Sequence, residues 1–264
     1  MKILNYLIIL RVSYKEVGTM QEKFHQPIEL SATPTNQSTP KIRKNFEPLI
    51  KIDNLHPRIF TQPIYYQQQI VSSLQSIYLR KEAFERLQQA VMLLPENYSF
   101  ILYDGYRPLQ VQQFLFAKFY KQIQYQNAHF SEEAVFKETL KFVAFPNEGQ
   151  EHFVPHVTGG AIDLTLGDDK GNALDLGTAF DEMSEKSATR YFELHSDENR
   201  QACFHRRLLY HCMTAAGFTN YAEEWWHYDF HNIAWATRVN AKEASYGAIE
   251  AKVENYLMKE YRYL

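Results

Sequence analysis

The sequence predicts an α+β protein in which helices flank a small antiparallel sheet. Segments that alternate between apolar and polar residues, as half-buried strands do, are few, and segments with helical spacing separate them. The polar stretch GDDKGN (167–172) has the composition of a hairpin turn, which favours antiparallel pairing. No internal repeat is visible, so these observations indicate a mixed domain and not a repeat protein.

Four segments have the features of helices. Apolar residues recur at helical spacing over residues 75–94, where the pattern ends before a proline. A second helix begins at Pro108, and a third is predicted over residues 131–143, where a serine N-cap is followed by two glutamates. The fourth covers residues 198–216 and is stopped by Gly217, because glycine readily adopts the left-handed conformation that ends a helix.

The predicted strands lie between these helices. Residues 98–103 and 161–166 are apolar segments bounded by turn residues, and they form the centre of the proposed sheet. Residues 218–221 and 225–230, which are rich in aromatic side chains, supply further strand. The charged tail, residues 241–264, is predicted to be helical.

Three regions follow from this pattern. Residues 1–49 form an N-terminal extension that we expect to be largely extended or disordered, because most of it is polar and lacks apolar periodicity. Residues 50–240 form the main domain, and residues 241–264 form the tail. Within the extension, Met20 is an alternative natural start.

The N-terminal stretch MKILNYLIIL bears on the location of the protein. Its apolar run is about eight residues long, far below the ~20 that a membrane-spanning helix needs. It also lacks a small-residue cleavage site, so we expect a cytoplasmic protein without a membrane span. The alternative is a periplasmic protein for which residues 1–19 act as an export signal.

Composition excludes several classes of protein. The net charge of −3 and the absence of a basic stripe argue against a nucleic-acid partner. The 18 tyrosines and 18 phenylalanines are therefore expected to line a core and a cleft. The two cysteines, Cys203 and Cys212, face opposite sides of one predicted helix, which excludes a disulfide framework and a cysteine-rich zinc site.

A candidate metal site lies around the Gly-Gly pair of HVTGGAIDLTL (156–166). On a straight strand His156 and Asp163 would face opposite sides, but the glycines let the backbone turn so that both can face one point. Imidazole and carboxylate both bind zinc, and a catalytic zinc commonly has three protein ligands. His227 would complete the set, with Glu224 near enough to take a proton from the attacking water. The sequence thus predicts one zinc ion per chain, in a central cleft.

Simpler explanations of the same residues remain open. His156 alone is more often an ordinary loop histidine, Glu224 could be a surface acid, and His227 could stack on the neighbouring tryptophans. Asp163 is harder to explain in this way, because a carboxylate inside an apolar strand needs a cation or hydrogen-bond donors.

Two rival ligand pairs also have the i, i+4 spacing of helical zinc sites: His152 with His156, and His227 with His231. Pro155 argues against a helix through the first pair, and the alternating aromatic residues argue against one through the second.

Three motifs occur in a fixed order: YDGYRP (103–108), HVTGGAIDLTL (156–166) and EWWH (224–227). Together with LGTAFDEM (176–183), they resemble the D-alanyl-D-alanine dipeptidases of the VanX type, within the LAS group of zinc peptidases. The likeness extends from about residue 54 to residue 235.

The resemblance implies a role for each matching residue. Glu224 matches the catalytic base, and Arg107 matches the arginine that polarises the scissile carbonyl and stabilises the oxyanion. Asp181 matches the acid that holds the free ammonium of the substrate, which would restrict the enzyme to dipeptides. Trp225 and Trp226 would be a rigid spacer between the base and the third ligand. The zinc ligands that the resemblance implies are His156, Asp163 and His227.

Two positions depart from the family pattern. Pro155 stands where the pattern has serine, and Thr158 stands where it has arginine. Both lie beside the expected cleft, so substrate contacts there differ from those of the family. The leading expectation is hydrolysis of D-Ala-D-Ala or a similar short D-amino-acid dipeptide. The alternatives are a murein peptidase of the same group that acts on longer peptides, and a zinc-binding module without turnover.

Overall fold

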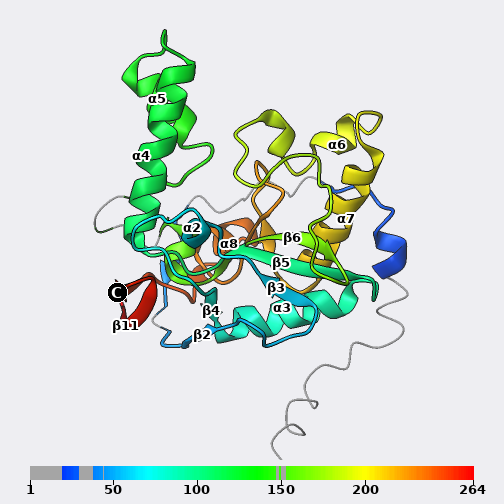
Figure 1. Cartoon of the computed structure of the whole chain (residues 1–264), viewed down its shortest axis with the longest axis horizontal. Coiled ribbons are helices and arrows are strands. Elements are labelled where there is room, and N and C mark those ends of the chain that lie inside the picture. The colour runs from blue at the N-terminus through cyan, green and yellow to red at the C-terminus, as the bar shows by residue number, and fades with distance from the viewer. Residues whose placement is uncertain (1–19, 30–37, 44, 147–148, 150–152) are drawn as a thin grey trace, which may run out of the picture.

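The computed structural model describes residues 20–29, 38–43, 45–146, 149 and 153–264 (Figure 1). Its centre is a five-stranded sheet with the order β3-β5-β6-β8-β7. All neighbours in this sheet are antiparallel except β3 and β5, which pair in parallel. The predicted α+β class with a small, mainly antiparallel sheet is confirmed. The five strands are β3 (Ile59–Thr61), β5 (Tyr98–Asp104), β6 (Ala161–Asp168), β7 (Thr219–Asn220) and β8 (His227–Asp229).

The register of the central strands brings polar residues together in the middle of the sheet. Asp163 on β6 pairs with His227 on β8, and on its other side it pairs with Asp104 at the end of β5. A register shift between Leu102 and Asp104 interrupts the ladder there. Such an irregularity re-aims side chains, and here it lies beside the residues of the candidate site.

Helices α3 (Lys81–Leu93) and α7 (Arg200–Ala215) contribute apolar faces to the main core. Leu87 and Val91 on α3, and Leu208 and Cys212 on α7, are fully buried with the apolar residues of β5 and β6. Helices α4 (Leu109–Gln126) and α5 (Glu132–Thr139) extend away from the sheet as a helical arm (Figure 1). Short helices complete the fold: α2 (Ile64–Gln67), η2 (Pro155–Thr158), η3 (Glu185–Ser187), α6 (Tyr191–Leu194) and α8 (Ile233–Arg238).

The described residues also form three two-stranded sheets. They are β1 (Lys41–Ile42) with β9 (Glu243–Ala244), β2 (Leu49–Lys51) with β4 (Tyr78–Arg80), and β10 (Ile249–Glu254) with β11 (Leu257–Tyr263).

The helices with capping signals are confirmed. The side chain of Ser131 accepts a hydrogen bond from Ala134 N at the start of α5, and Gly217 follows α7 with a φ of 96°. The first predicted helix begins too early, since residues 78–80 form a strand that pairs with residues 49–51 before α3 begins. That pairing joins distant parts of the sequence, so helical spacing alone could not reveal it.

The prediction of a helical tail is wrong. Residues 249–263 form the antiparallel hairpin β10–β11, turned by Asn255 and Tyr256, which both have positive φ. The prediction for the N-terminal extension is wrong in part: residues 20–23 are helical, and Met20 and Phe24 belong to the main core. Residues 1–19 and 30–37, to which the same prediction and the export signal refer, lie outside the described residues.

In the described part of the chain, no helix combines the length and apolar character needed to cross a membrane. Cys203 and Cys212 are both buried free thiols, and they do not pair with each other.

Candidate active site

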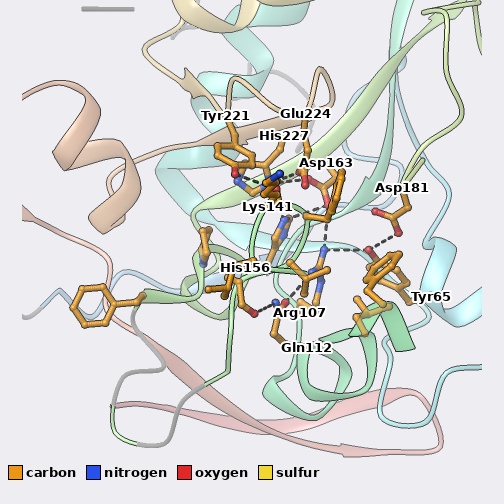
Figure 2. A pocket seen from close by; sticks show the side chains of 18 of the residues that line it. Tyr65, Arg107, Gln112, Lys141, His156, Asp163, Asp181, Tyr221, Glu224 and His227 are labelled. Carbon is orange, nitrogen blue, oxygen red and sulfur yellow. Dashed lines mark hydrogen bonds and ion pairs between the residues drawn. The ribbon is translucent and has the colours of Figure 1, made fainter. Parts of the chain in front are cut away.

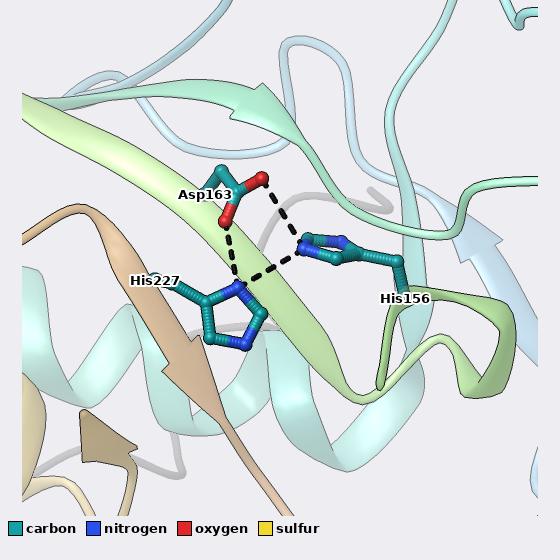
Figure 3. Close-up of side chains that lie close together, drawn as sticks. All are labelled: His156, Asp163 and His227. Atoms are coloured by element: carbon teal, nitrogen blue, oxygen red, sulfur yellow. Dashed lines mark hydrogen bonds and ion pairs between the residues drawn. The ribbon is translucent and has the colours of Figure 1, made fainter. Parts of the chain in front are cut away.

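Three side chains converge at the centre of the sheet (Figure 3). His156, Asp163 and His227 are buried, and one ligand atom of each lies within 4.8 Å of the others. His156 Nε2 is 3.1 Å from His227 Nδ1 and 3.2 Å from Asp163 Oδ2, while His227 Nδ1 is 2.9 Å from Asp163 Oδ1. Two ligands on a tetrahedral zinc ion are separated by about 3.3 Å, given Zn–N distances near 2.0 Å. The donor types and their spacing therefore fit the predicted cofactor, one zinc ion.

The backbone around Gly159 and Gly160 places His156 against the sheet. Gly159 has a φ of 72°, which lets the chain reverse between the short helix η2 and strand β6. A Cβ atom on Gly160 would lie 2.4 Å from the carbonyl oxygen of Phe230. Any side chain at Gly160 would therefore displace β6 from β8 and separate Asp163 from His227.

Each histidine is oriented by a hydrogen bond from its second ring nitrogen. His156 Nδ1 donates to the Gly105 carbonyl at 2.8 Å, and His227 Nε2 lies 3.2 Å from Asp229 Oδ2. Since a carbonyl and a carboxylate accept, these nitrogens carry the protons, and His156 Nε2 and His227 Nδ1 are left for a metal. Asp229 is itself fixed by Asn232 and Arg238.

Arg107 is buried beside the cluster, and each of its three side-chain nitrogens bonds to a neighbouring side chain (Figure 2). Its Nε donates to Asp104 Oδ2 at 2.6 Å and its Nη1 to Gln112 Oε1 at 2.8 Å. Its Nη2 lies 3.2 Å from the Tyr65 hydroxyl and 3.1 Å from Asp163 Oδ2. Burial opposes the charge, but Tyr65 and the carboxylates of Asp104 and Asp163 raise the pKa of Arg107 above its ordinary value. The residue is thus a fixed cation next to a candidate ligand.

Asp181 lies on the other side of Tyr65. The Tyr65 hydroxyl donates to Asp181 Oδ2 at 3.0 Å, so Arg107, Tyr65 and Asp181 form a continuous chain of hydrogen bonds (Figure 2). Burial of the carboxyl group, reinforced by the nearby charge of Asp163, raises the pKa of Asp181 to about 7. A carboxylate in such a place gains most from a cationic partner.

Glu224 lies next to the cluster, at the turn that precedes β8. Its Oε2 is 4.0 Å from His227 Nδ1, the nitrogen that is left for a metal. Burial, reinforced by the charges of Asp163 and Asp181, raises the pKa of Glu224 to about 8. Strand β8 begins at His227, so the backbone bends between Glu224 and His227 and lets both face one point.

The two tryptophans between them are buried and pack edge to face, with ring centroids 5.1 Å apart. Trp225 Nε1 donates to Thr178 Oγ1, and Trp226 packs on Phe180. The Trp-Trp pair therefore fixes the turn that carries Glu224, as the spacer prediction requires.

The His-Asp-His cluster and the charged side chains around it line a cavity of about 240 Å³ (Figure 2). One part of its wall is charged and holds Arg107, Asp163, Asp181, Glu224 and the two histidines. The rest is largely apolar and comes from the α4–α5 arm and the segment that follows it: Leu115, Phe119, Leu140, Phe142, Val143 and Phe153. The cavity is the predicted central cleft.

The structure describes only one of the two rival ligand pairs in full, His227 with His231. His231 stacks on Phe230 with ring centroids 3.9 Å apart and takes no part in the cluster. His152 lies outside the described residues. Sequence reasoning missed Tyr65 and Gln112, which have no local signal. It also missed Asp104, although this residue lies within the motif YDGYRP, and Asp229, which follows EWWH by two residues.

A buried His-Asp-His cluster beside a carboxylate and an arginine, in a cleft of an α+β domain, is the arrangement of a metallopeptidase. The chain belongs to the D-Ala-D-Ala dipeptidase family Peptidase_M15, whose model matches residues 61–244. The resemblance inferred from the motifs is thereby confirmed.

Individual relatives agree with the family match. The D-alanyl-D-alanine dipeptidase of Synechocystis sp. is 31% identical over 195 residues, which cover 65% of this chain and 79% of that protein. The D-alanyl-D-alanine dipeptidase of Escherichia coli is 31% identical over 157 residues, or 59% of this chain and 68% of that protein. Among solved structures, VanYB in complex with D-Alanine-D-Alanine aligns with a TM-score of 0.36 at 18% identity, over 64% of this chain and 80% of that one.

Proposed function

We propose that this protein is a zinc dipeptidase that hydrolyses D-Ala-D-Ala, or a similar short D-amino-acid dipeptide, to free amino acids. The observation that carries the proposal is the convergence of Glu224, Arg107 and Asp181 on one cleft around a His-Asp-His donor set. A purely structural zinc site would need none of these three residues.

His156, Asp163 and His227 would hold the zinc ion. When bound, zinc polarises the scissile carbonyl and makes water a stronger nucleophile at neutral pH. The remaining chemistry falls to the side chains of the chain itself.

Glu224 is the proposed general base. It takes a proton from the attacking water as the water oxygen bonds to the carbonyl carbon, and it then gives that proton to the leaving nitrogen as the C–N bond breaks. A pKa raised to about 8 makes the carboxylate a stronger base than an exposed glutamate, and the protonated form is then a usable acid.

Arg107 is the proposed electrophilic residue. Its fork of donors can bind the carbonyl oxygen as that oxygen gains negative charge, and the bonds to Asp104 and Gln112 keep the guanidinium from turning away. Because the cation is in place before the reaction, little reorganisation is needed.

Asp181 is the proposed acceptor of the substrate ammonium. An ammonium at this carboxylate would fix the distance between the amino terminus and the scissile bond, so that the enzyme removes only one residue. The Tyr65 hydroxyl bonds to Asp181 Oδ2, so we expect Oδ1 to accept from the substrate ammonium.

We further infer that the protein acts in the cytoplasm. Support comes from Cys203 and Cys212, which are both unpaired thiols in the described structure and suit a reducing compartment. Cell fractionation with detection of the native protein tests this, and recovery in the periplasm would contradict it.

The first experiment measures release of free D-alanine from D-Ala-D-Ala by the zinc-loaded protein, with Glu224→Ala alongside. Release by the wild type and little release by the variant is the expected result. A protein that binds one zinc ion but releases nothing would refute the dipeptidase assignment. The same assay with a longer murein peptide then distinguishes an endopeptidase from a protein without turnover.

A further inference from the structure

Residues 176–188 form a closed loop with Asp181 near its middle. The two ends of the loop lie close together, because Leu176 and Ala188 both bond to Arg206 of helix α7, and this arrangement is that of an Ω-loop. Internal hydrogen bonds tie it together: Ser187 Oγ donates to the Glu182 carbonyl at 2.6 Å, and Ala179 N donates to Glu182 Oε2. Asp181 has a φ of 59°, a conformation that a non-glycine residue adopts at a cost.

One guanidinium closes this loop. Arg206 on α7 is only 2% exposed, and its Nε donates to the Leu176 carbonyl at 2.8 Å. Its Nη1 donates to the Ala188 carbonyl at 2.7 Å and its Nη2 to the Lys186 carbonyl at 2.8 Å. The first carbonyl belongs to the start of the loop and the other two to its end. The side chain therefore holds the two ends of the loop together.

The charge of Arg206 has an unusual environment for a buried arginine. Among the described residues it forms no ion pair with a carboxylate, and its guanidinium lies over the rings of Phe192 and Trp225, at 4.6 and 5.8 Å. Burial lowers the pKa of Arg206 to about 10, so it stays charged at neutral pH. Within the described part of the chain, the hydrogen bonds of this buried cation all go to backbone carbonyls of residues 176–188, although Asp175 and Glu182 also interact with its charge. The positioning of the loop is therefore the evident effect of Arg206.

The same contacts reach the turn that carries Glu224. Trp225 N donates to the Ser187 carbonyl at 3.0 Å, and Trp225 Nε1 donates to Thr178 Oγ1 at 2.7 Å. Trp225 is thus bonded to both ends of the loop, lies against Arg206, and adjoins Glu224 in the chain. The loop with Asp181 and the turn with Glu224 are held as one unit.

Asp181 needs such support for an electrostatic reason. Its carboxylate is repelled by the negative charges of Asp163 and Asp104 and is stabilised by Arg107 and the Tyr65 hydroxyl. Because Coulomb interactions depend on distance, a small displacement of the loop would change how well this carboxylate can hold an ammonium.

We propose that Arg206 is a positioning residue for recognition of the substrate amino terminus: by closing the loop 176–188, it fixes Asp181 relative to Glu224 and the metal ligands. The inference rests on the proposed dipeptidase function, because the ammonium is the group that Asp181 would hold. Arg206 is not one of the residues that line the cavity, so its effect on the substrate would be indirect.

The test compares Arg206→Met and Arg206→Lys with Arg58→Met. Arg58 is a matched control because it also donates to three carbonyls, those of Leu94, Pro95 and Tyr98, but away from the cleft. For each zinc-loaded protein, kcat and KM are measured with D-Ala-D-Ala and with its N-acetyl derivative, which has no ammonium.

We expect Arg206→Met to raise the KM for D-Ala-D-Ala by about tenfold or more, because small misplacements of a binding group are costly, with a smaller change in kcat. The preference for the free amine over the N-acetyl compound should fall by a similar factor. Arg206→Lys should recover part of the loss, and Arg58→Met should keep the wild-type KM and preference. Equal loss of kcat with both substrates and an unchanged preference in Arg206→Met would overturn the proposal.

A second measurement does not depend on activity. Trypsin can cleave after Lys186, which lies within the loop and is exposed. We expect cleavage there to be faster in Arg206→Met, and to a lesser degree in Arg206→Lys, than in the wild type or Arg58→Met. If the wild type released no D-alanine, the proposed function would fail while this measurement still decided whether Arg206 closes the loop. Unchanged cleavage in both Arg206 variants would refute that role.

Discussion

Arg107 Nη2 lies 3.1 Å from Asp163 Oδ2, so the proposed electrophilic arginine is paired with a proposed zinc ligand before any substrate enters. Both side chains are buried. The pair links two tasks, because Arg107 orients the ligand carboxylate and also presents its charge to the carbonyl oxygen.

Replacement of Arg107 by lysine tests this link. Lysine keeps the charge but lacks the fork that bonds to Asp104, Gln112 and Asp163 at once. We expect kcat to fall by about 10²–10³-fold, as when one oxyanion donor is lost. Zinc affinity, measured by competition with a chromogenic chelator, should fall by about tenfold. Arg86→Lys on the surface of α3 is the control and should change neither quantity.

Replacement of Glu224 by glutamine separates catalysis from binding. Glutamine has the same shape but cannot accept a proton, so kcat should fall by about 10²–10⁴-fold while zinc content stays at one ion per chain. The neighbouring Glu223 is exposed, and Glu223→Gln should retain wild-type kinetics. Equal activity of the two variants would rule out Glu224 as the base.

Removal of the metal should abolish D-alanine release and lower the thermal unfolding temperature, since a ligand that binds only the folded state stabilises it. Dialysis against a chelator followed by calorimetry measures this, and added zinc should restore both properties. His227→Gln should abolish stoichiometric zinc binding. His231→Gln, which removes the rival ligand of the sequence analysis, should still bind one zinc ion, and loss of zinc from it would contradict the assignment.

Replacement of Asp181 by asparagine should weaken recognition of the substrate ammonium. Loss of one charge-assisted contact of about 1.5–3 kcal/mol corresponds to a rise in KM of about 10–100-fold. The KM for N-acetyl-D-Ala-D-Ala should change little, because that compound offers no ammonium. A variant that loses both substrates equally would show that Asp181 has another role.

The pH dependence of kcat/KM should also reveal the ionisation of Asp181. The pKa of Asp181 is raised to about 7 by burial, and only the ionised form attracts an ammonium. We therefore expect kcat/KM for D-Ala-D-Ala to fall as the pH drops through about 7, and this part of the decrease should be missing in Asp181→Asn. Because burial raises the pKa of Asp181 in the folded state, ionisation of this group destabilises the fold, and Asp181→Asn should be more thermostable than the wild type above about pH 7. This advantage should shrink progressively as the pH falls from about 7 towards about 4, the ordinary pKa of an aspartate in the unfolded chain.

Elements with a local signal could be predicted from the sequence. Ser131 supplies the capping oxygen of α5, and Gly217 supplies the left-handed residue after α7. The tail shows the limit of this approach, because its glutamates, lysines and alanines favour a helix by composition. Its alternation of apolar and charged residues, and Asn255 at the first position of a two-residue turn, instead fit a hairpin. The alternation was the stronger signal, and composition misled the prediction.

The residues of the site also fall into two groups: those that the sequence motifs predict and those that they do not. The motifs of the sequence contain the three proposed ligands, Glu224 and Arg107, and the structure brings them together. Tyr65 and Gln112 could not be predicted, because they reach Arg107 only through the packing of α2 and α4 beside the sheet. Tyr65 contacts Arg107 from 42 residues away in the sequence, and Gln112, although only five residues after Arg107, makes its contact through the orientation of α4. No spacing rule describes either contact.

The loops that carry His156 and Arg107 contact residues 248 and 249, which the ribosome adds much later. Tyr106, next to Arg107, donates to the Ile249 carbonyl of β10, and Ala248 packs on Val154 and Val157 around His156. Arg80 bonds to the carbonyls of Thr158 and Gly247 and so joins the two regions. Since the ribosome delivers the chain from its N-terminus, these loops gain their last supports only when the β10–β11 hairpin emerges. We therefore expect a nascent chain to acquire zinc only after the β10–β11 hairpin has left the ribosome.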